Sequence, residues 1–254
     1  MFRVMCGSAV AHVGDARTRV AMARAAAVAV GTFALPLILG AAPAPAAKWT
    51  RVAYWRMDEA SGASMADAVG DHTGTTTDVE TGLAGRVGRA YGFDGESSYA
   101  LVPSADTLDP GARDVRISLW IKTSDKPETP DWDLVKKGYA AESPGYYKVE
   151  YQPDGRASCG FAGTEGSQDV TGGPDLADGN WHQVTCTKTA TSIALTVDGQ
   201  PVASEETTIG EIANSEDLVL GAYRGPTHSG HFLGAMDEVV IEMANGSSER
   251  NSEE

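Results

Sequence analysis

The sequence predicts an all-β protein, a sandwich of two antiparallel β-sheets, and three observations lead to this fold class. Polar and apolar residues alternate over residues 115–122, 147–151 and 191–197, which is the period-two pattern of strands with one buried face. Asp-Gly pairs suited to tight turns punctuate these runs, at 94–95, 178–179 and 198–199. From Trp49 onward, no stretch of 12 residues has a helical stripe of apolar side chains.

Residues 181–200 give the clearest local prediction, two short strands joined by a hairpin. Trp181 and His182 open the first strand, and the second runs into Asp198-Gly199, which supplies the positive backbone dihedrals of a tight turn. Short strands with turns at this spacing favour a sandwich over alternating strands and helices. Within such a strand, we expect Trp181 and His182 to serve packing rather than chemistry.

The chain divides into three parts. We expect residues 1–47 to be a signal peptide, 48–243 a single domain and 244–254 a disordered polar tail. Within the domain, residues 61–85 are rich in Gly, Ser, Thr and Asp, and residues 123–133 hold two prolines among charged neighbours. Both segments are predicted to be long surface loops.

The N-terminal segment has the order of a secretory signal. Three arginines precede an apolar run over residues 25–39, and Ala44-Pro45-Ala46 fits the small-residue cleavage pattern. The alternative is an uncleaved membrane anchor. The apolar run is only about 15 residues and contains Pro36, whereas a span needs roughly 20. We therefore expect cleavage after Ala46 and a secreted protein with no membrane attachment.

The charge of the chain is strongly acidic, with a formal net charge of −15. Without residues 1–47, 16 basic and 34 acidic residues remain. A field of this sign repels phosphate backbones and anionic lipid, so nucleic-acid binding is not expected. It is compatible with cations, neutral glycans or basic partners, and it also suits a secreted protein that has only to stay soluble.

The cysteines predict one disulfide. Of the three cysteines, Cys6 leaves with the signal, and Cys159 and Cys186 form an even pair in an oxidising destination. A zinc site would need more ligands of this kind than two cysteines provide. In the chain-entropy description, closing this loop stabilises the fold by roughly 3.5 kcal/mol.

The distribution of short motifs resembles a laminin-G-like jelly-roll domain of the concanavalin A-like lectin/glucanase superfamily. The similarity runs from about Trp49 to Met243. No single motif is specific, but their joint order and spacing are similar to the family pattern. The motifs are YWRMDE at 54–59, YGFDG at 91–95, ISLWIK at 117–122, DGNWH at 178–182, LTVDG at 195–199 and FLGAMDEV at 232–239.

The resemblance implies a structural cation, commonly calcium, where the first and last strands approach the Phe-Asp-Gly turn. The matching residues are Asp58, Asp94 and Asp237. Calcium takes six to eight oxygen ligands, and several carboxylates with turn carbonyls can supply them. The alternative is that Asp58 and Asp94 only accept backbone N–H bonds at turns and strand ends.

A ligand platform is expected at a loop rim or on an exposed sheet face. Trp132 lies in the acidic, proline-containing segment and is the best candidate for an exposed aromatic that stacks on a glycan. His228 and His231 lie among glycines and could share a metal only with further ligands nearby. A glycine-rich loop between strands is the simpler interpretation for them.

The superfamily also includes glycoside hydrolases and polysaccharide lyases, so an enzymatic function is an alternative. Retaining hydrolysis needs two carboxylates about 5 Å apart, and the Glu-x-Asp-x-x-Glu pattern that would place them is absent. Alternation predicts that Asp237 and Glu242 point to opposite faces of their strand. No catalytic residue is therefore assigned.

The sequence favours a secreted, non-catalytic binding domain for a glycan or an extracellular protein. A carbohydrate-active enzyme and a purely structural surface protein are the alternatives, because fold alone does not decide function. Facing carboxylates in a groove would favour the enzyme, and an exposed aromatic strip would favour glycan binding. A flat convex surface would favour contact with a protein. The oligomeric state is left open.

Overall fold

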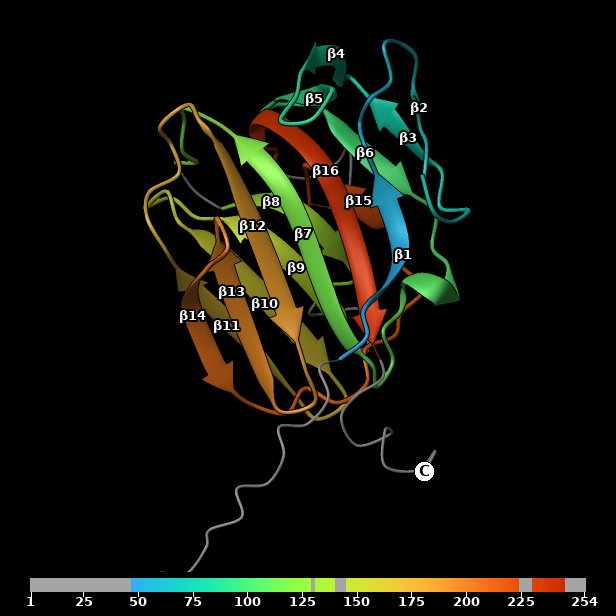
Figure 1. Cartoon of the computed structure of the whole chain (residues 1–254), viewed down its shortest axis with the longest axis vertical. Coiled ribbons are helices and arrows are strands. Elements are labelled where there is room, and N and C mark those ends of the chain that lie inside the picture. The colour runs from blue at the N-terminus through green and yellow to red at the C-terminus, as the bar shows by residue number, and fades with distance from the viewer. Residues whose placement is uncertain (1–46, 129–130, 140–144, 224–229, 245–254) are drawn as a thin grey trace, which may run out of the picture. The chain divides into compact units, whose positions relative to one another are not determined.

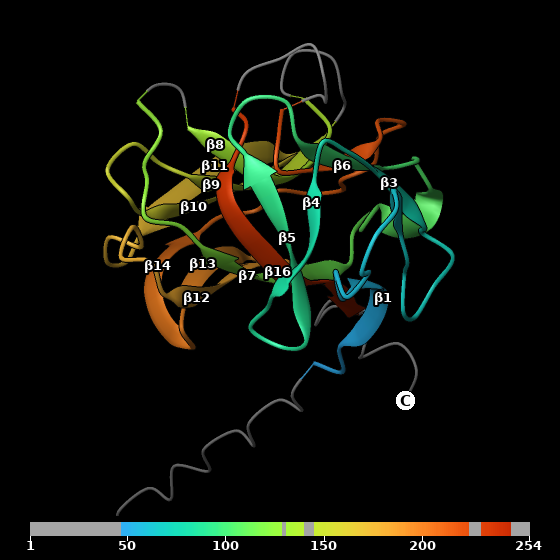
Figure 2. The ribbon, with the colours of Figure 1, turned by 90° about the horizontal axis from the view of Figure 1, so that it is seen from above.

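The computed structural model describes residues 47–128, 131–139, 145–223 and 230–244. Almost all of the predicted signal peptide and tail, and also His228, lie outside these residues. The described chain forms two antiparallel sheets that face each other as two layers (Figures 1 and 2). No helix in these described ranges is long and apolar enough to cross a membrane.

Sheet A contains eight strands. Its order along the hydrogen-bonded path is β14 (Gln200–Glu206), β13 (Ser192–Val197), β12 (Trp181–Lys188), β7 (Asp114–Lys122), β16 (Leu233–Ala244), β5 (Arg89–Asp94) and β4 (Glu80–Ala84), and β1 (Thr50–Trp55) also pairs with β16. The long strand β16 therefore pairs with β7 on one side, and with β5 and then β1 on the other.

Sheet B also contains eight strands, and it forms the second layer. Its order is β11 (Gly166–Gly172), β10 (Ala157–Gly163), β9 (Tyr146–Tyr151), β8 (Trp132–Lys137), β15 (Leu218–Leu220), β6 (Tyr99–Val102), β3 (Gly74–Thr77) and β2 (Ser64–Met65). One short 3-10 helix, η1 (Asp106–Leu108), precedes β7. The predicted all-β sandwich is confirmed.

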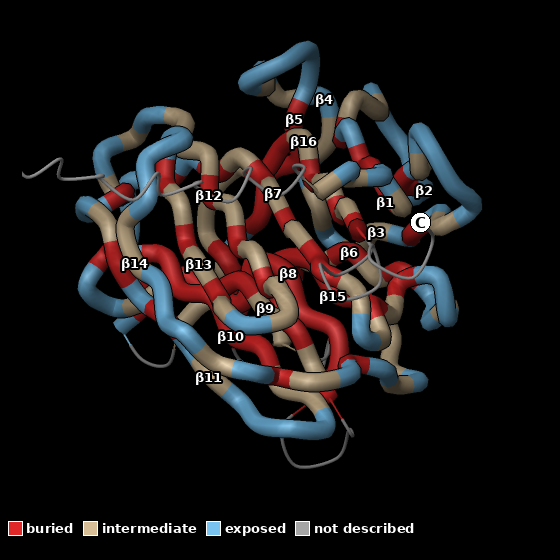
Figure 3. Tube along the Cα trace, turned by 60° about the horizontal axis from the view of Figure 1, so that its bottom comes forward, coloured by how far each residue is buried: buried red, intermediate tan, exposed pale blue. Residues whose placement is uncertain are grey.

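The predicted alternation explains why the strands lie as they do. From Val115 onward in β7 and from Val184 onward in β12, every second residue is buried, and the intervening residues are at least partly exposed. Figure 3 shows this as alternating buried and intermediate bands along both strands. Asp198 and Gly199 have φ values of 51° and 74°, which the tight turn between β13 and β14 requires.

Part of the loop prediction was wrong. Residues 61–85 contain β2, β3 and β4, and these strands lie at the outer ends of the two sheets. Their Thr- and Gly-rich composition hides them, because β2 to β4 bury few side chains and so show little apolar alternation. The β4–β5 turn, residues 85–88, matters below because it folds against β16.

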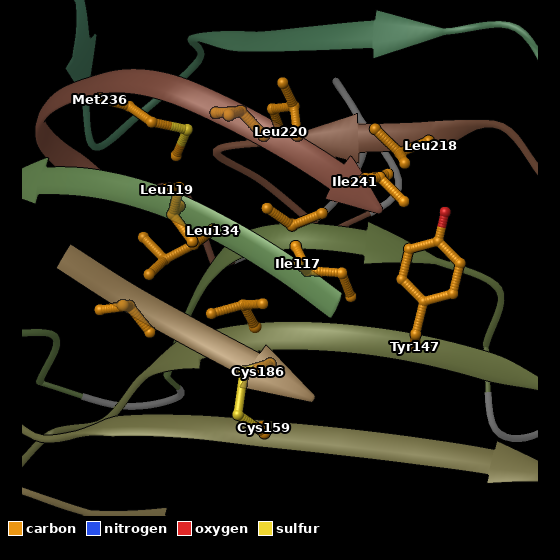
Figure 4. Close-up of a cluster of buried hydrophobic side chains, with 14 of the residues drawn as sticks. Ile117, Leu119, Leu134, Tyr147, Cys159, Cys186, Leu218, Leu220, Met236 and Ile241 are labelled. Carbon is orange, nitrogen blue, oxygen red and sulfur yellow. A yellow bond between two sulfur atoms is a disulfide. The ribbon is translucent and has the colours of Figure 1, made fainter. Parts of the chain in front are cut away.

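The core fills the space between the inner faces of the two sheets. Ile117 and Leu119 of sheet A pack there with Leu134 and Tyr147 of sheet B, all with no exposed surface (Figure 4). Burying an aliphatic side chain of this size stabilises a fold by about 1.5–3 kcal/mol. This shared core fixes the two outer faces, where ligands can reach the protein.

One disulfide joins the two layers. Cys159 lies in β10 of sheet B and Cys186 in β12 of sheet A, with their Cα atoms 5.6 Å apart. Figure 4 shows the bond crossing the core between the two strands. The cross-link therefore ties one sheet to the other, away from both outer faces.

Candidate functional site

The outer face of sheet A, which points away from sheet B, contains a polar depression of about 340 Å³. Cross-strand register builds it, since Arg51 opposes Glu242 and Glu242 opposes Arg116 across β1, β16 and β7. The next row toward the other end of the strands adds hydroxyls and an aliphatic side chain. The full lining is Arg51, Arg116, Ser118, Gln183, Thr185, Val240 and Glu242.

The groups in this depression suit a ligand rich in hydroxyls. Arg116 donates from Nε and Nη2 to Glu242 Oε2 at 2.8 and 2.6 Å. The hydroxyls of Ser118 and Thr185 lie 3.0 Å apart. The side-chain amide of Gln183 has no hydrogen-bond partner among the described residues, so both its donor and its acceptor remain available.

Aromatic rings border the depression, and each stacks with arginine. The Arg116 guanidinium lies 4.5 Å from the centroid of the Trp49 ring, and Arg86 lies 4.5 Å from that of Trp120. The Tyr54 ring has two such neighbours, Arg51 at 5.1 Å and Arg56 at 5.3 Å. Stacking of this kind holds the long side chains in place.

A β-bulge in β16 changes which residues share this face. Asp237 opposes Trp120 but Val240 opposes Ser118, so Glu238 is an extra residue, with a φ of 54°. Asp237 and Glu242 consequently lie on the same face, and the predicted opposite orientation was wrong. The bulge reversed the parity that a regular strand would have had.

The corrected register does not produce a reacting pair of carboxylates. Asp237 has no exposed surface, and its Oδ2 accepts a hydrogen bond of 2.9 Å from the Val87 backbone in the β4–β5 turn. Burial raises the pKa of Asp237 to about 6. Glu242 is held between Arg116 and Arg51. Asp237 and Glu242 are therefore not placed as a catalytic pair on either side of a glycosidic bond.

The three predicted cation ligands do not meet at one point. Asp58 Oδ1 accepts a 2.7 Å hydrogen bond from the backbone N–H of Arg89, the first residue of β5. Asp237 accepts its bond from Val87 in the turn just before it, so both carboxylates lie beside the start of β5. Asp94 is at the other end of β5, roughly 16 Å away along the strand. Among the described residues, no group of three or more His, Cys, Asp or Glu is arranged to hold a metal ion.

The two ends of β5 differ in how well they fit a cation. Asp94 already accepts bonds from the backbone N–H groups of Glu96, Ser97 and Ser98 and from two serine hydroxyls. Despite some burial, these donors hold the pKa of Asp94 well below its usual range. Asp237 Oδ1, in contrast, is buried with no hydrogen-bond partner among the described residues. Only the Asp58–Asp237 end has an oxygen that a cation would satisfy.

Trp132 is not on a loop, contrary to the prediction. It is the first residue of β8 and opposes Tyr151, whose ring stacks on it at 5.6 Å. Phe232 meets it edge-on at 5.7 Å, and the indole packs against the core. Its ring faces are therefore largely occupied, and its predicted glycan contact remains a prediction.

The predicted histidines have structural partners. His182 bridges two turns, with Nδ1 2.8 Å from Asp198 and Nε2 3.0 Å from Asp178. These carboxylates raise the pKa of His182, although partial burial, the largest contribution, works in the opposite direction. His231 is buried, with Nδ1 3.3 Å from the Ser98 carbonyl.

A second depression of about 340 Å³ lies at one end of the sandwich, beside the Phe-Asp-Gly turn. Its floor is mainly apolar, with Leu83, Phe93 and Leu233, and carboxylates such as Glu80 and Asp125 stand around it. Asp94 also lines it, but its oxygens serve its own turn. Charged side chains at its rim, among them Lys122 and Asp125, also lack hydrogen-bond partners among the described residues, but the lining is more apolar than that of the depression on sheet A.

The outer face of sheet B bears a network of charges. Lys136 Nζ lies 2.9 Å from Asp133 and 3.6 Å from Glu150, and Lys148 Nζ lies 2.8 Å from Glu150 and 3.1 Å from Asp169. Asp133 and Glu150 are each only 4% exposed. Burial raises the pKa of Glu150 to about 7 and also raises the pKa of Asp133.

Sequence reasoning missed the face of sheet A as a site. Alternation did place Arg116, Ser118 and Trp120 together on one side of β7, so half of the site was visible in the pattern. The pairing of β1 with β16, which brings Arg51 and Tyr54 beside them, joins the first and last strands of the chain. No local pattern indicates a contact between segments that far apart.

With this geometry, the chain is a jelly-roll type β-sandwich domain. A family model described as the Concanavalin A-like lectin/glucanases superfamily, of the laminin-G type, matches residues 94–244. The chain belongs to this superfamily, which confirms the resemblance found in the sequence. No curated protein sequence matches the chain.

Several solved structures share the fold. The binding domain of Paraclostridial Mosquitocidal Protein 1 is 15% identical with a TM-score of 0.60, over 79% of this chain and 50% of that one. Domain 4 of AbnA, a GH43 extracellular arabinanase from Geobacillus stearothermophilus solved with arabinotriose, is 17% identical with a TM-score of 0.58, over 81% of this chain and 98% of that one. Mouse laminin alpha1 domains LG4-5 are 21% identical with a TM-score of 0.50, over 65% and 45%.

These similarities establish the fold and not a ligand. The chain spans half the length of the mosquitocidal binding domain and nearly the whole of the arabinanase domain.

Proposed function

We propose that this protein is a secreted, non-catalytic domain that binds a glycan on the outer face of sheet A. The observation that supports this most directly is the polar depression of about 340 Å³, lined by an amide, two hydroxyls, two guanidiniums and a carboxylate. The aromatic rings of Trp49, Tyr54 and Trp120 stand at its border.

The chemistry of these groups matches that of a sugar. Planar amide, guanidinium and carboxylate groups each present two polar atoms, which can bond to neighbouring hydroxyls of a pyranose or furanose ring. The ring C–H groups of a sugar are apolar and pack against aromatic side chains. A site with both kinds of group, open to solvent along a sheet, fits an extended oligosaccharide.

The comparisons support a binding role without assigning it. Domain 4 of the arabinanase is described in complex with arabinotriose, and the mosquitocidal structure is described as a binding domain. The lack of facing carboxylates in the depression supports a non-catalytic role. The N-terminal signal pattern supports export, and N-terminal sequencing of the exported protein should start near Lys48.

Titration calorimetry with arabinotriose and with a panel of neutral oligosaccharides tests the proposal. Gln183→Ala should lower the affinity about tenfold or more for the glycan that binds, because a buried sugar hydroxyl would lose its partner. The matched control is Gln168→Ala, which removes the same side chain from β11 of sheet B and should leave affinity unchanged. Binding that is lost equally in both variants, or no binding to any glycan, would reject the site.

A structural calcium ion is proposed at the β4–β5 turn, with Asp58 and Asp237 as ligands. The buried, unpartnered Oδ1 of Asp237 supports this, while Asp94 has no free oxygen to contribute. Bound calcium would fix the turn that bears Arg86. Calorimetric titration of chelator-treated protein should give calcium binding that Asp237→Asn abolishes. No heat from the wild type would reject the ion.

A further inference from the structure

The arginines on the face of sheet A fall into two kinds. Arg51 and Arg116 share the carboxylate of Glu242, which lies between them. Arg56 and Arg86 are exposed, and within the described parts of the chain neither has a carboxylate at ion-pair distance. With Lys122 of β7, which is also exposed and has no carboxylate partner among the described residues, they give this face three unpaired cations in a chain whose net charge is −15.

Both unpaired guanidiniums are held beside the depression. Arg86 stacks on Trp120, which opposes Gln183 in the depression directly across β7 and β12. Arg56 stacks on Tyr54, which opposes Val240, another lining residue. Because each guanidinium already rests on a ring, less side-chain entropy is lost when it meets an anion.

The spacing of charge on this face limits which anion fits. Trp120, on which Arg86 rests, lies four residues from Arg116 on β7, so the unpaired Arg86 and the paired Arg116 are about 13 Å apart along the strand. Glu238 and Glu242 lie between the arginines and would repel a densely charged chain. The arrangement suits a chain that carries no more than one carboxylate on each sugar, among neutral hydroxyls.

We propose that the ligand of this face is an acidic polysaccharide of the uronate type, with Arg56 and Arg86 as its carboxylate-binding residues. This inference rests on the proposed glycan site and specifies its substrate class. A planar guanidinium binds a carboxylate through two parallel N–H groups. An esterified uronate has no negative charge, so it cannot form this charge-assisted pair.

The experiment compares one oligosaccharide in two chemical states. A galacturonan oligosaccharide and its fully methyl-esterified form have the same sugar chain and differ in charge. By titration calorimetry, the acid form should bind at least about tenfold more tightly, and its affinity should fall as salt is raised. Arg56→Gln and Arg86→Gln should each remove most of that preference while leaving the melting temperature unchanged.

The control is Arg156→Gln. Arg156 is equally an exposed arginine, but it pairs with Asp154 at the β9–β10 turn, far along the chain from this face. Its replacement should leave both affinities unchanged. An equal effect of all three substitutions would overturn the inference, because it would indicate general attraction between polyanion and cation.

The remaining outcomes separate this inference from the proposed function. Equal binding of acid and ester, or binding of neutral oligosaccharides alone, would overturn the uronate class and leave the glycan site standing. Dextran sulfate binding as tightly as the galacturonan would also overturn it, because Glu238 and Glu242 should repel a chain with more than one charge on each sugar. No binding to any glycan would overturn both.

Discussion

The two sheets present polar outer faces built by the same alternation, yet the two faces are used differently. On sheet B, Lys136 and Lys148 are paired with three carboxylates, and the centre of the network is almost inaccessible to solvent. On sheet A, the corresponding positions form an open depression with an unpartnered amide and two unpaired arginines nearby.

The difference shows that charge on a sheet face does not by itself mark a ligand site. A buried ion network satisfies its own members, and a ligand would have to break those pairs before it could bind. An exposed group without a partner has no such competitor. Exposure and pairing, rather than residue type, therefore separate the candidate binding face from the structural one.

The largest expected effect is on the sheet B network. Lys136→Met removes the cation that contacts both Asp133 and Glu150, leaving two buried carboxylates without that partner. Such a loss should lower the free energy of unfolding by about 3–5 kcal/mol. Urea denaturation would measure it, and a cost below about 1 kcal/mol would show that the network is not closed to solvent.

The disulfide should affect both faces alike, because it joins β10 to β12 through the core. The double variant Cys159→Ala and Cys186→Ala should lose roughly 3.5 kcal/mol of stability for a loop of this length. Urea denaturation of the double variant beside the reduced wild type would measure the loss. Glycan affinity at temperatures where the variant remains folded should be unchanged, and a selective loss of affinity would contradict the rigid-platform account.

Both sheets should contribute to the pH dependence of stability, Asp237 of sheet A up to about pH 6 and Glu150 of sheet B up to about pH 7. The pKa of Glu150 is raised to about 7 in the folded protein, above its ordinary value of 4.5, so the native state holds the proton longer than the unfolded state. This contribution is then full below about pH 4.5 and is lost as pH rises to about 7, by on the order of 3 kcal/mol. The groups facing Glu150 are Lys136, Lys148, Asp131, Asp133 and Gln152.

Glu150→Gln should flatten this decline, as followed by melting temperature between pH 4.5 and 8. Asp94 should have the opposite effect on stability, because its lowered pKa stabilises the fold above about pH 3.8 and that contribution is lost in acid. Asp94→Asn should therefore remove part of the loss of stability at acid pH. A wild-type protein whose stability rises from pH 5 to pH 7.5 would contradict the assignment to Glu150.

The smallest stability effect should be on sheet A. Arg116→Gln breaks a partly exposed ion pair with Glu242, and such pairs contribute less than about 1 kcal/mol. The same substitution should nevertheless weaken glycan binding about tenfold, since the depression loses a donor. Calorimetry and urea denaturation on one variant would separate the two effects. A large loss of stability without loss of binding would reverse the comparison.

The sequence predicted the layers of the fold better than the site. The alternation in β7 and the Asp198-Gly199 turn are local, and both appeared as predicted. The bulge at Glu238 was missed because a left-handed residue inside an apolar strand leaves no sign in the alternation. Trp132 was misplaced because a Pro-rich neighbourhood suggested a loop, whereas the Tyr151 ring that covers it lies in the next strand.

The site itself depends on register between strands distant in the chain. Arg51 and Glu242 oppose each other although they belong to the first and last strands. Likewise, the separation of Asp94 from Asp58 follows from the length of β5 and not from the motifs that contain them. Residue types were readable from the sequence, but their partners were not.

Amide chemical-shift mapping during titration with the galacturonan oligosaccharide tests the central claim most directly. The account predicts perturbations clustered on β1, β7, β12 and β16 of sheet A and on the β4–β5 turn that bears Arg86. Perturbations centred on β8, β9 and β10 of sheet B, or on the rim depression beside Asp94, would contradict it.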